Sequence, residues 1–165
     1  MKRIYLVRHG KSAWDTATLH DHDRPILPKG EWKTRMIAEY LIKQQLIPAC
    51  IISSTAARAA ATARILTQIL GIDPSMLFFD KRLYDCAATT CYDVLIELAD
   101  QIPSVMLVGH NPGISEFASL LAKSPVTVFP TSAVMGIDAD LETWTDVPLC
   151  AAQKLFFVTP SMLKK

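Results

Sequence analysis

The chain has 165 residues, the size of one domain, so we expect a single domain over residues 1–165. Half of the residues are hydrophobic and a fifth are charged, a balance that argues against a disordered chain or a coiled coil. The 17 Lys and Arg residues nearly balance the 16 Asp and Glu residues, giving a net charge of +1. Without a global positive field, we expect no binding to nucleic acid or to a membrane, and any anion site must come from a local cluster.

No stretch of the sequence approaches the roughly 20 apolar residues needed to cross a bilayer. The apolar run after the first basic residues covers only Ile4 to Val7, whereas a secretory signal needs about 7–15 such residues. We therefore expect a cytoplasmic protein. The four cysteines form neither a CxxC pair nor a zinc pattern, so we expect free thiols in a reducing compartment.

Short apolar or β-branched runs alternate with segments of helical periodicity along most of the chain. The stretch 80–90 has no clear period. The predicted elements, in chain order, are a strand at 4–7, a helix at about 29–46, a strand at 50–53, a helix at about 56–70, a strand at 76–79, a helix opened by a Thr90–Asp93 capping box, a strand at 105–108, and a helix with Asn111 as N-cap and Pro112 as its first residue.

The alternation stops after this last helix. Two further strands, at 133–137 and 155–158, have no helix between them and are most simply an antiparallel pair at a sheet edge. The whole pattern predicts an α/β fold, a three-layer sandwich whose central sheet is mostly parallel with an antiparallel edge strand and helices on both faces. Ligands of such sheets bind beyond the carboxyl ends of the strands.

Cationic and imidazole side chains follow several predicted strands. Arg8 and His9 come after the first strand, Arg58 lies just after the second, and His110 follows the fourth. With Arg24 they would place two histidines and three arginines around one point. Such crowding is unfavourable unless an anion lies among the cations, and the guanidinium fork matches the oxygens of phosphate.

The two histidines favour covalent phosphoryl transfer. Neutral imidazole is a good nucleophile toward phosphorus, and a phosphoramidate on His9 would hydrolyse readily. Gly10 lets the backbone approach the ligand, and a carbonyl that accepts the Nδ1–H proton of His9 would free Nε2 for attack. His110 can donate to the phosphoryl oxygens in the transition state, as the arginines do. Covalent catalysis of this kind needs no metal.

Other polar residues have competing interpretations. Ser54 is either a substrate contact or the N-cap of the next helix. Thr62, one turn beyond Arg58, either supports that side chain or simply packs. The alternating stretch 20–23, His-Asp-His-Asp, is a candidate zinc or di-metal site, but it is short and has no second acidic cluster. A polar loop leading into Arg24 is the preferred interpretation.

Five short motifs resemble those of the histidine phosphatase superfamily, also called phosphoglycerate mutase-like. In chain order they read LVRHGKS, DRPILPKG, SSTAARAAATA, VMLVGHNPG and FPTSA, and they span residues 4 to about 137. More narrowly, the chain looks like a SixA-type phosphohistidine phosphatase. Five motifs in the family's order are far more specific than any one of them.

The resemblance implies roles for the residues that match it. His9 is the residue that becomes phosphorylated. Arg8, Arg24 and Arg58 grip the phosphate, and His110 completes the pocket. Neither a metal nor an organic cofactor is implied.

The sequence departs from the family pattern in places. Thr55 stands where many relatives have proline and Ser132 where they have glycine, and both changes look structural. The mutase and acid-phosphatase branches use a Glu or Asp, often near the end of the third strand, to protonate the leaving oxygen. Here residues 80–85 contain no glutamate, and Asp85 and Asp21 are the candidate acids.

The weak acid candidates favour a substrate with a good leaving group. An alkoxide benefits from protonation as it departs, whereas imidazole, with a pKa near ~6.5, leaves with less help. The chain is also too short for the helices that close over sugar phosphates in mutases. We therefore expect a phosphorylated protein substrate, such as a phosphohistidine carrier or phosphotransfer domain, and a monomer by default.

Three alternatives stay open from the sequence. The first is a small metal-independent phosphomonoesterase that uses Asp85 or Asp21 as its acid. The second is a non-catalytic phosphate-binding module that kept the pocket without turnover. The third is a metallohydrolase built on His20 and His22.

Overall fold

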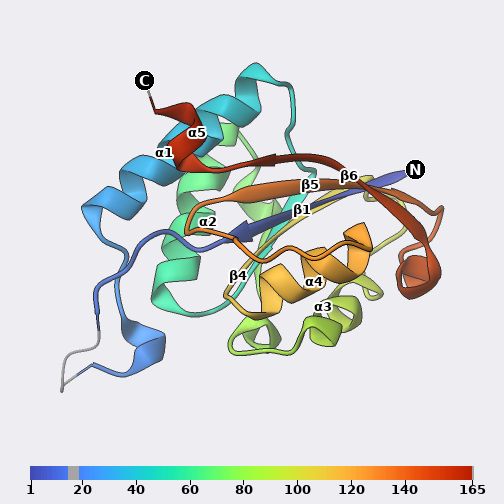
Figure 1. Cartoon of the computed structure of the whole chain (residues 1–165), viewed down its shortest axis with the longest axis horizontal. Helices are drawn as coiled ribbons and strands as arrows, with labels where there is room; N and C mark the ends of the chain where they lie inside the picture. The colour runs from blue at the N-terminus through green and yellow to red at the C-terminus, as the bar shows by residue number, and fades with distance from the viewer. Residues whose placement is uncertain (15–18, 165) are drawn as a thin grey trace.

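The computed structural model describes residues 1–14 and 19–164 of the chain. A six-stranded sheet lies at its centre, with the strands in the order β3–β2–β4–β1–β5–β6 (Figure 1). The strands are β1 Lys2–Arg8, β2 Cys50–Ser53, β3 Leu77–Phe79, β4 Ser104–Gly109, β5 Val134–Asp140 and β6 Ala151–Val158.

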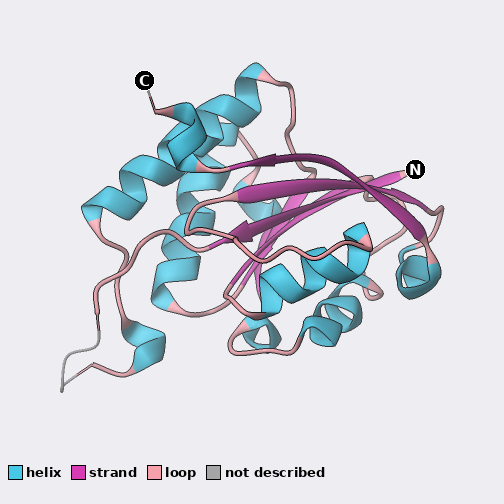
Figure 2. Ribbon diagram, viewed as in Figure 1, coloured by secondary structure: helices cyan, strands magenta, loops and turns pink. Residues whose placement is uncertain are grey.

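Helices cover both faces of the sheet, as Figure 2 shows, which confirms the predicted three-layer α/β fold. Among the described residues, no helix has the length and apolar character to cross a membrane. One helix layer holds α1 (Pro28–Lys43), α2 (Ala57–Leu70) and α5 (Pro160–Leu163). The other layer holds α3 (Ala88–Leu95) and α4 (Gly113–Ala122). The short 3-10 turns are η1 (Asp21–Asp23), η2 (Pro74–Met76), η3 (Lys81–Leu83) and η4 (Trp144–Leu149).

The sheet is mostly parallel, as predicted. Strands β1, β2, β3 and β4 run parallel to one another, β5 runs antiparallel to β1, and β6 runs antiparallel to β5. The last two strands are therefore the antiparallel pair that the sequence predicts. Within this pair, β6 takes the sheet edge and β5 lies one place inward.

The central strands bury side chains on both faces. Leu6 and Leu107 pack toward α3 and α4, while Tyr5 and Met106 pack toward α1 and α2. Successive side chains of a strand point to opposite faces, so a strand covered on both sides needs a continuous apolar run. This double burial explains why β1 and β4 could be recognised from sequence. The four cysteines are free thiols, as predicted.

Several helix ends differ from the sequence expectation. The capping-box prediction is wrong, because α3 begins at Ala88, already buried in the core, and Thr90 lies inside its first turn. Helix α1 ends at Lys43 rather than near 46, since Gln45 adopts a left-handed φ of 58°. Helix α4 begins at Gly113, one residue later than expected.

The start of α1 presses against the loop that follows β1. The amide of Leu27 donates to the Lys11 carbonyl at 2.8 Å. A Cβ atom placed on Gly30 would collide with the carbonyl oxygen of Lys11 and lie 2.7 Å from its amide nitrogen. Glycine is therefore required here by close backbone approach, and it fixes where the loop after His9 lies.

We expect Gly30→Ala to lower the free energy of unfolding by about 1–3 kcal/mol, because the backbone atoms of Lys11 cannot move away from the added methyl group without strain. Urea denaturation measures this loss, and hydrolysis rates should fall with it because the loop after His9 moves. The control is Gly71→Ala, whose φ is 70° with nothing within 4 Å of the added Cβ. Backbone strain in Gly71→Ala should lower the free energy of unfolding by about 1–2 kcal/mol without changing the hydrolysis rate. Equal stability of Gly30→Ala and the parent would contradict the close approach.

Candidate active site

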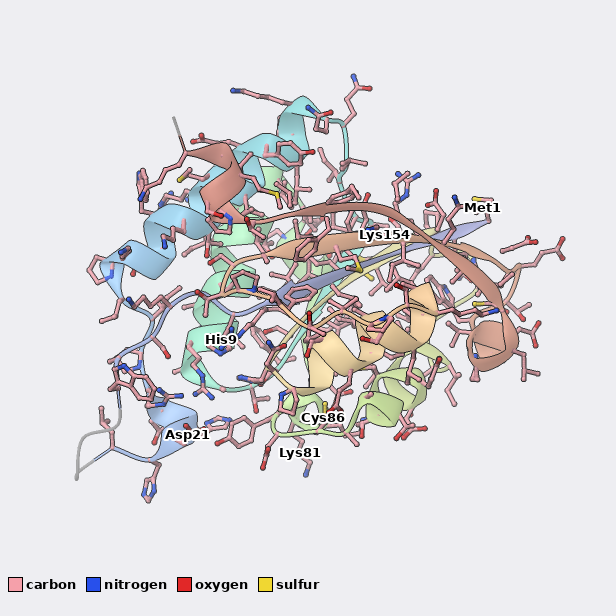
Figure 3. All side chains as sticks on the ribbon, in the orientation of Figure 1. Met1, His9, Asp21, Lys81, Cys86 and Lys154 are labelled. Carbon is pink, nitrogen blue, oxygen red and sulfur yellow. The ribbon has the colours of Figure 1, made fainter. Side chains whose placement is uncertain are left out.

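The segments after β1, β3 and β4, together with the first turn of α2, surround a cavity of about 780 Å³ at one end of the sheet. Figure 3 shows His9 and Asp21 toward this end, far from Lys154. The cavity is lined by the five residues expected to contact a phosphate, namely Arg8, His9, Arg24, Arg58 and His110. The tertiary structure therefore brings together groups that lie up to a hundred residues apart in sequence.

The rings of His9 and His110 face one another across the cavity floor. Their centroids are 5.0 Å apart, with an angle of 49° between the ring planes. Only 7% of His9 and 8% of His110 is exposed. A phosphoryl group held at this site would thus contact both rings and be shielded from solvent on that side.

Backbone contacts fix the His9 ring. Its Nδ1 atom lies 2.8 Å from the carbonyl oxygen of Gly10, which can only accept, so the proton is on Nδ1 and the lone pair is on Nε2. The His9 amide donates to the carbonyl of Gly109 at 3.0 Å. These contacts prepare Nε2 as a nucleophile, in the tautomer that the sequence argument requires.

Thr62 ties the histidine loop to α2. Its hydroxyl accepts from the Gly10 amide at 2.8 Å and donates to the Arg58 carbonyl at 2.7 Å. Thr62 is fully buried and does not line the cavity. It therefore supports both the loop after His9 and the first turn of α2, so of its two interpretations the structural support is the one observed.

Burial keeps both imidazoles uncharged. Burial lowers the pKa of His9 to about 4, against the effect of the hydrogen bond to Gly10, and Arg58 and Arg8 add to the decrease. Burial likewise lowers the pKa of His110 to about 3, with further contributions from His9 and Arg58. Near neutral pH, His9 therefore carries a free lone pair without needing a base to deprotonate it.

Ser54 lies behind His110 rather than in the cavity. Its hydroxyl is fully buried, 2.8 Å from Nε2 of His110, and accepts from the Ala56 amide at 3.2 Å. Both sequence interpretations of Ser54 need correction, because it does not line the cavity and the N-cap of α2 is Ala56. If the hydroxyl proton points to Nε2, the ring carries its own proton on Nδ1, which suits a donor to phosphate.

Three buried nitrogens at the site find no hydrogen-bond acceptor within the described part of the chain. They are Nε of Arg8, Nε of Arg58 and Nδ1 of His110. Leaving a buried donor unsatisfied is costly, so each such group calls for an explanation. A ligand rich in acceptor oxygens, such as a phosphoryl group, matches this set of donors.

The carboxylate of Asp21 bridges the site's cations. It accepts from Nε of Arg24 at 3.0 Å, from Nη2 of Arg58 at 3.1 Å and from the hydroxyl of Tyr84 at 2.6 Å. The Tyr84 hydrogen bond and then Arg58 lower the pKa of Asp21 to about 2, against the effect of burial. A carboxylate held in this form is poorly suited to donate a proton, and it instead orients the two guanidinium groups.

Asp85 is the better placed of the two candidate acids. It lines the cavity, is exposed, and adopts a left-handed φ of 49° in the turn after η3. The contacts therefore favour Asp85 over Asp21 as a possible proton donor.

Sequence reasoning missed Tyr84. Besides its bond to Asp21, its ring packs edge-on against His110, with centroids 5.5 Å apart, and against His22 at 4.8 Å. The stretch 80–90 has no period because it folds as η3, a turn and only the first residues of α3, so no pattern indicated this position. Only the contacts across the site reveal that Tyr84 connects Asp21 to His110.

The His-Asp stretch at 20–23 forms η1, and its side chains have separate partners. His22 Nε2 lies 2.8 Å from the hydroxyl of Thr55, while Asp21 binds the arginines. Within residues 1–14 and 19–164, no three His, Cys, Asp or Glu side chains converge as a metal site would require. Thr55, where relatives have proline, thus supplies a partner for η1.

Ser132, where relatives have glycine, sits in a left-handed conformation with φ of 63°. Its amide donates to the Arg8 carbonyl at 2.9 Å, and its hydroxyl lies 2.9 Å from that of Thr34 on α1. The hydrogen bond to Thr34 offsets part of the strain that a non-glycine residue carries there.

A family model described as the histidine phosphatase superfamily (branch 1) matches residues 4–112, more than half of the chain. The chain belongs to the histidine phosphatase superfamily. It is similar to the solved structure of a candidate phosphohistidine phosphatase SixA from Agrobacterium tumefaciens, with 26% identity and a TM-score of 0.82 over 96% of this chain and 98% of the other. The protein histidine phosphatase SixA, solved with tungstate, shares the fold at 23% identity and a TM-score of 0.84, over 98% and 99% of the two chains.

A relative in sequence is an uncharacterized chloroplastic protein of Arabidopsis thaliana, 29% identical over 142 residues. The match covers 81% of this chain and 65% of that protein, so the chain spans just under two thirds of this relative's length. Family membership and the likeness to SixA support a phosphatase that acts through a histidine. The cavity at His9 and His110 has the geometry for this chemistry.

We expect His9 and His110 to stay neutral well below the unfolded-state pKa of ~6.5. Because burial lowers both folded-state pKa values, the unfolded chain binds these protons first. The free energy of unfolding should therefore be highest above about pH 6.5 and fall as the pH drops toward about 4. Imidazole ¹⁵N chemical shifts measure the protonation directly, and His9→Gln should flatten part of the stability profile. A titration midpoint near 6.5 for His9 would contradict its burial.

Proposed function

We propose that this chain removes the phosphoryl group from protein phosphohistidine through a covalent intermediate on His9. The observation that carries the proposal is that the carboxylate of Asp21 accepts hydrogen bonds from Tyr84, Arg58 and Arg24, contacts that favour its ionised form. Within the described residues lining the cavity, the other carboxyl group is that of Asp85, which is exposed. A site with so little acid assistance favours imidazole, whose pKa of ~6.5 makes it a much better leaving group than an alkoxide.

In the first step, Nε2 of His9 attacks the phosphorus. A P–N bond to His9 forms while the P–N bond to the substrate imidazole breaks, and the departing ring keeps the bonding pair and takes a proton from solvent. Arg8 and Arg58, together with Nδ1–H of His110, donate to the phosphoryl oxygens as charge redistributes in the transition state. The Gly10 carbonyl stabilises the proton on Nδ1 of His9 as positive charge develops on the ring.

In the second step, water attacks the phosphorus of phospho-His9. A P–O bond forms, the P–N bond breaks, and the electron pair returns to Nε2, while the proton lost by the water goes to solvent or to the phosphate. Inorganic phosphate leaves. His9 is again neutral, in the same tautomer, since its pKa of about 4 disfavours protonation at neutral pH.

Two further observations support a protein substrate. The cavity opens to solvent, and its rim carries Trp14, which is 84% exposed, so a phosphorylated side chain on a larger molecule has access. A solved structure that shares this fold over 98% of this chain is named a protein histidine phosphatase, and it was determined with tungstate, a tetrahedral oxyanion.

We expect His9→Ala to abolish hydrolysis of a phosphohistidine peptide and Arg58→Ala to lower kcat/KM by about 10²–10³. Rapid quenching of the parent protein in alkali should trap acid-labile phosphate on His9. Arg35→Ala is the matched control, since Arg35 is exposed on α1 and does not line the cavity, and it should keep the parent rate. Turnover by His9→Ala at the parent rate would overturn the mechanism, and phosphate binding by the parent protein with neither turnover nor phosphate on His9 would indicate a phosphate-binding module.

A phosphomonoesterase is the second candidate, because the carboxyl group of Asp85 lines the cavity and is exposed. If the principal proposal holds, Asp85→Asn leaves the phosphohistidine rate unchanged and lowers only the slow rate on an alkyl phosphate, whose leaving group needs the proton. Initial rates on the two substrates, with parent and variant, measure this difference. A strong preference of the parent protein for the alkyl ester would replace the principal proposal by the second.

A further inference from the structure

Four lysines lie beside the mouth of the cavity, and we name them the basic rim: Lys11, Lys29, Lys33 and Lys164. Lys11 belongs to the loop after His9, Lys29 and Lys33 to the first turns of α1, and Lys164 follows α5. Helix α5 packs beside α1, as Figure 1 shows. The rim is thus assembled from three separate parts of the chain.

The cavities of the structure establish that these lysines are neighbours. Lys11 and Lys33 both line the cavity at His9. Lys33 also lines a small hollow that Lys164 shares. Lys29 and Lys33 are four residues apart on α1, so they lie on the same helix face. The other three lysines therefore all lie near Lys33, so the rim extends from the cavity at Lys11 to Lys164 outside it.

Among residues 1–14 and 19–164, the basic rim forms no ion pair, since no carboxylate lies within ion-pair distance of any rim lysine. Glu31 is two residues from both Lys29 and Lys33, and side chains two apart on a helix do not face each other. Consistent with this, burial and then the charges of Lys29, Lys164 and Lys11 lower the pKa of Lys33.

Binding of a phosphoryl group does not explain the whole rim. Lys29 and Lys164 are exposed and do not line the cavity, where the arginines and His110 already supply donors. Large aromatic side chains accompany the lysines, with Trp14 at the cavity mouth 84% exposed and Trp32 beside Lys33 51% exposed. Exposed tryptophan side chains are typical of protein interfaces.

We propose that the basic rim docks an acidic surface of the protein substrate, next to its phosphorylated histidine. The inference rests on the proposed function and names the character of the partner for that site. A group of lysines on a protein of net charge +1 is complementary to clustered Asp and Glu side chains. Such complementarity accelerates association and lowers KM, while the chemistry at His9, and so kcat, stays the same.

The experiment uses two phosphohistidine peptides with the same central residues, one flanked by glutamates and the other by glutamines. The test variant is K29Q/K164Q, which alters only rim residues outside the cavity. The control is K43Q/K154Q, which removes the same charge from the last residue of α1 and from β6; neither lysine lines the cavity, and Figure 3 shows Lys154 far from His9. Free phosphohistidine serves as the small substrate, and kcat and KM are measured at low and at high salt.

We expect the parent protein to prefer the acidic peptide by about tenfold in kcat/KM at low salt, and to lose most of this preference at high salt. K29Q/K164Q should lose most of the preference through KM, whereas K43Q/K154Q should keep it. All three proteins should hydrolyse free phosphohistidine equally. Equal rates on the two peptides, or an equal loss in the control, would overturn the docking proposal.

Binding of the unphosphorylated acidic peptide, followed by fluorescence anisotropy, separates this inference from the proposed function. If no phosphohistidine substrate is hydrolysed, the proposed function is wrong, yet rim-dependent binding of the acidic peptide would still support the docking surface. Absence of that binding would overturn it. Tighter rim-dependent binding to single-stranded DNA or to phosphatidylserine vesicles would also overturn it, in favour of a nucleic acid or a membrane.

Discussion

The burial of two imidazoles beside arginines is the constraint on which the site depends. Taking His9 and His110 out of water, close to Arg58 and Arg8, makes their protonated forms unfavourable. A neutral His9 is a nucleophile without an attached base, and its proton is already on the nitrogen that faces Gly10. The parallel strands β1 and β4 make this possible, because they end side by side and present both rings at one point.

The carboxylate of Asp21 supplies negative charge beside the arginines of the site. It holds the guanidinium groups of Arg24 and Arg58 in place, which otherwise repel each other. The same contacts keep it ionised, so one carboxylate cannot both order the arginines and donate a proton. In the proposed function, the preference for an imidazole leaving group follows from how the chain arranges its own charges.

Positive charge extends from the cavity outward. Arginines with fixed hydrogen bonds lie inside, where planar forks can match phosphoryl oxygens. Flexible lysines lie at the mouth, where long-range attraction matters more than exact geometry. Fixed arginines inside the cavity and flexible lysines at its mouth suit a substrate that carries one reactive group on a larger surface.

The sequence by itself determined the alternation of strands and helices and the residues that follow each strand, including His9, Arg58 and His110. These features are local, because burial on one or both faces sets the periodicity and a strand end sets the position of the next residue. Tertiary structure alone decided that Ser54 supports His110, that Tyr84 joins the site, that Asp21 binds arginines and that α3 starts at Ala88. Apart from the Asp21–Arg24 contact, each of those outcomes depends on a partner more than 30 residues away or on core packing, which no local pattern encodes.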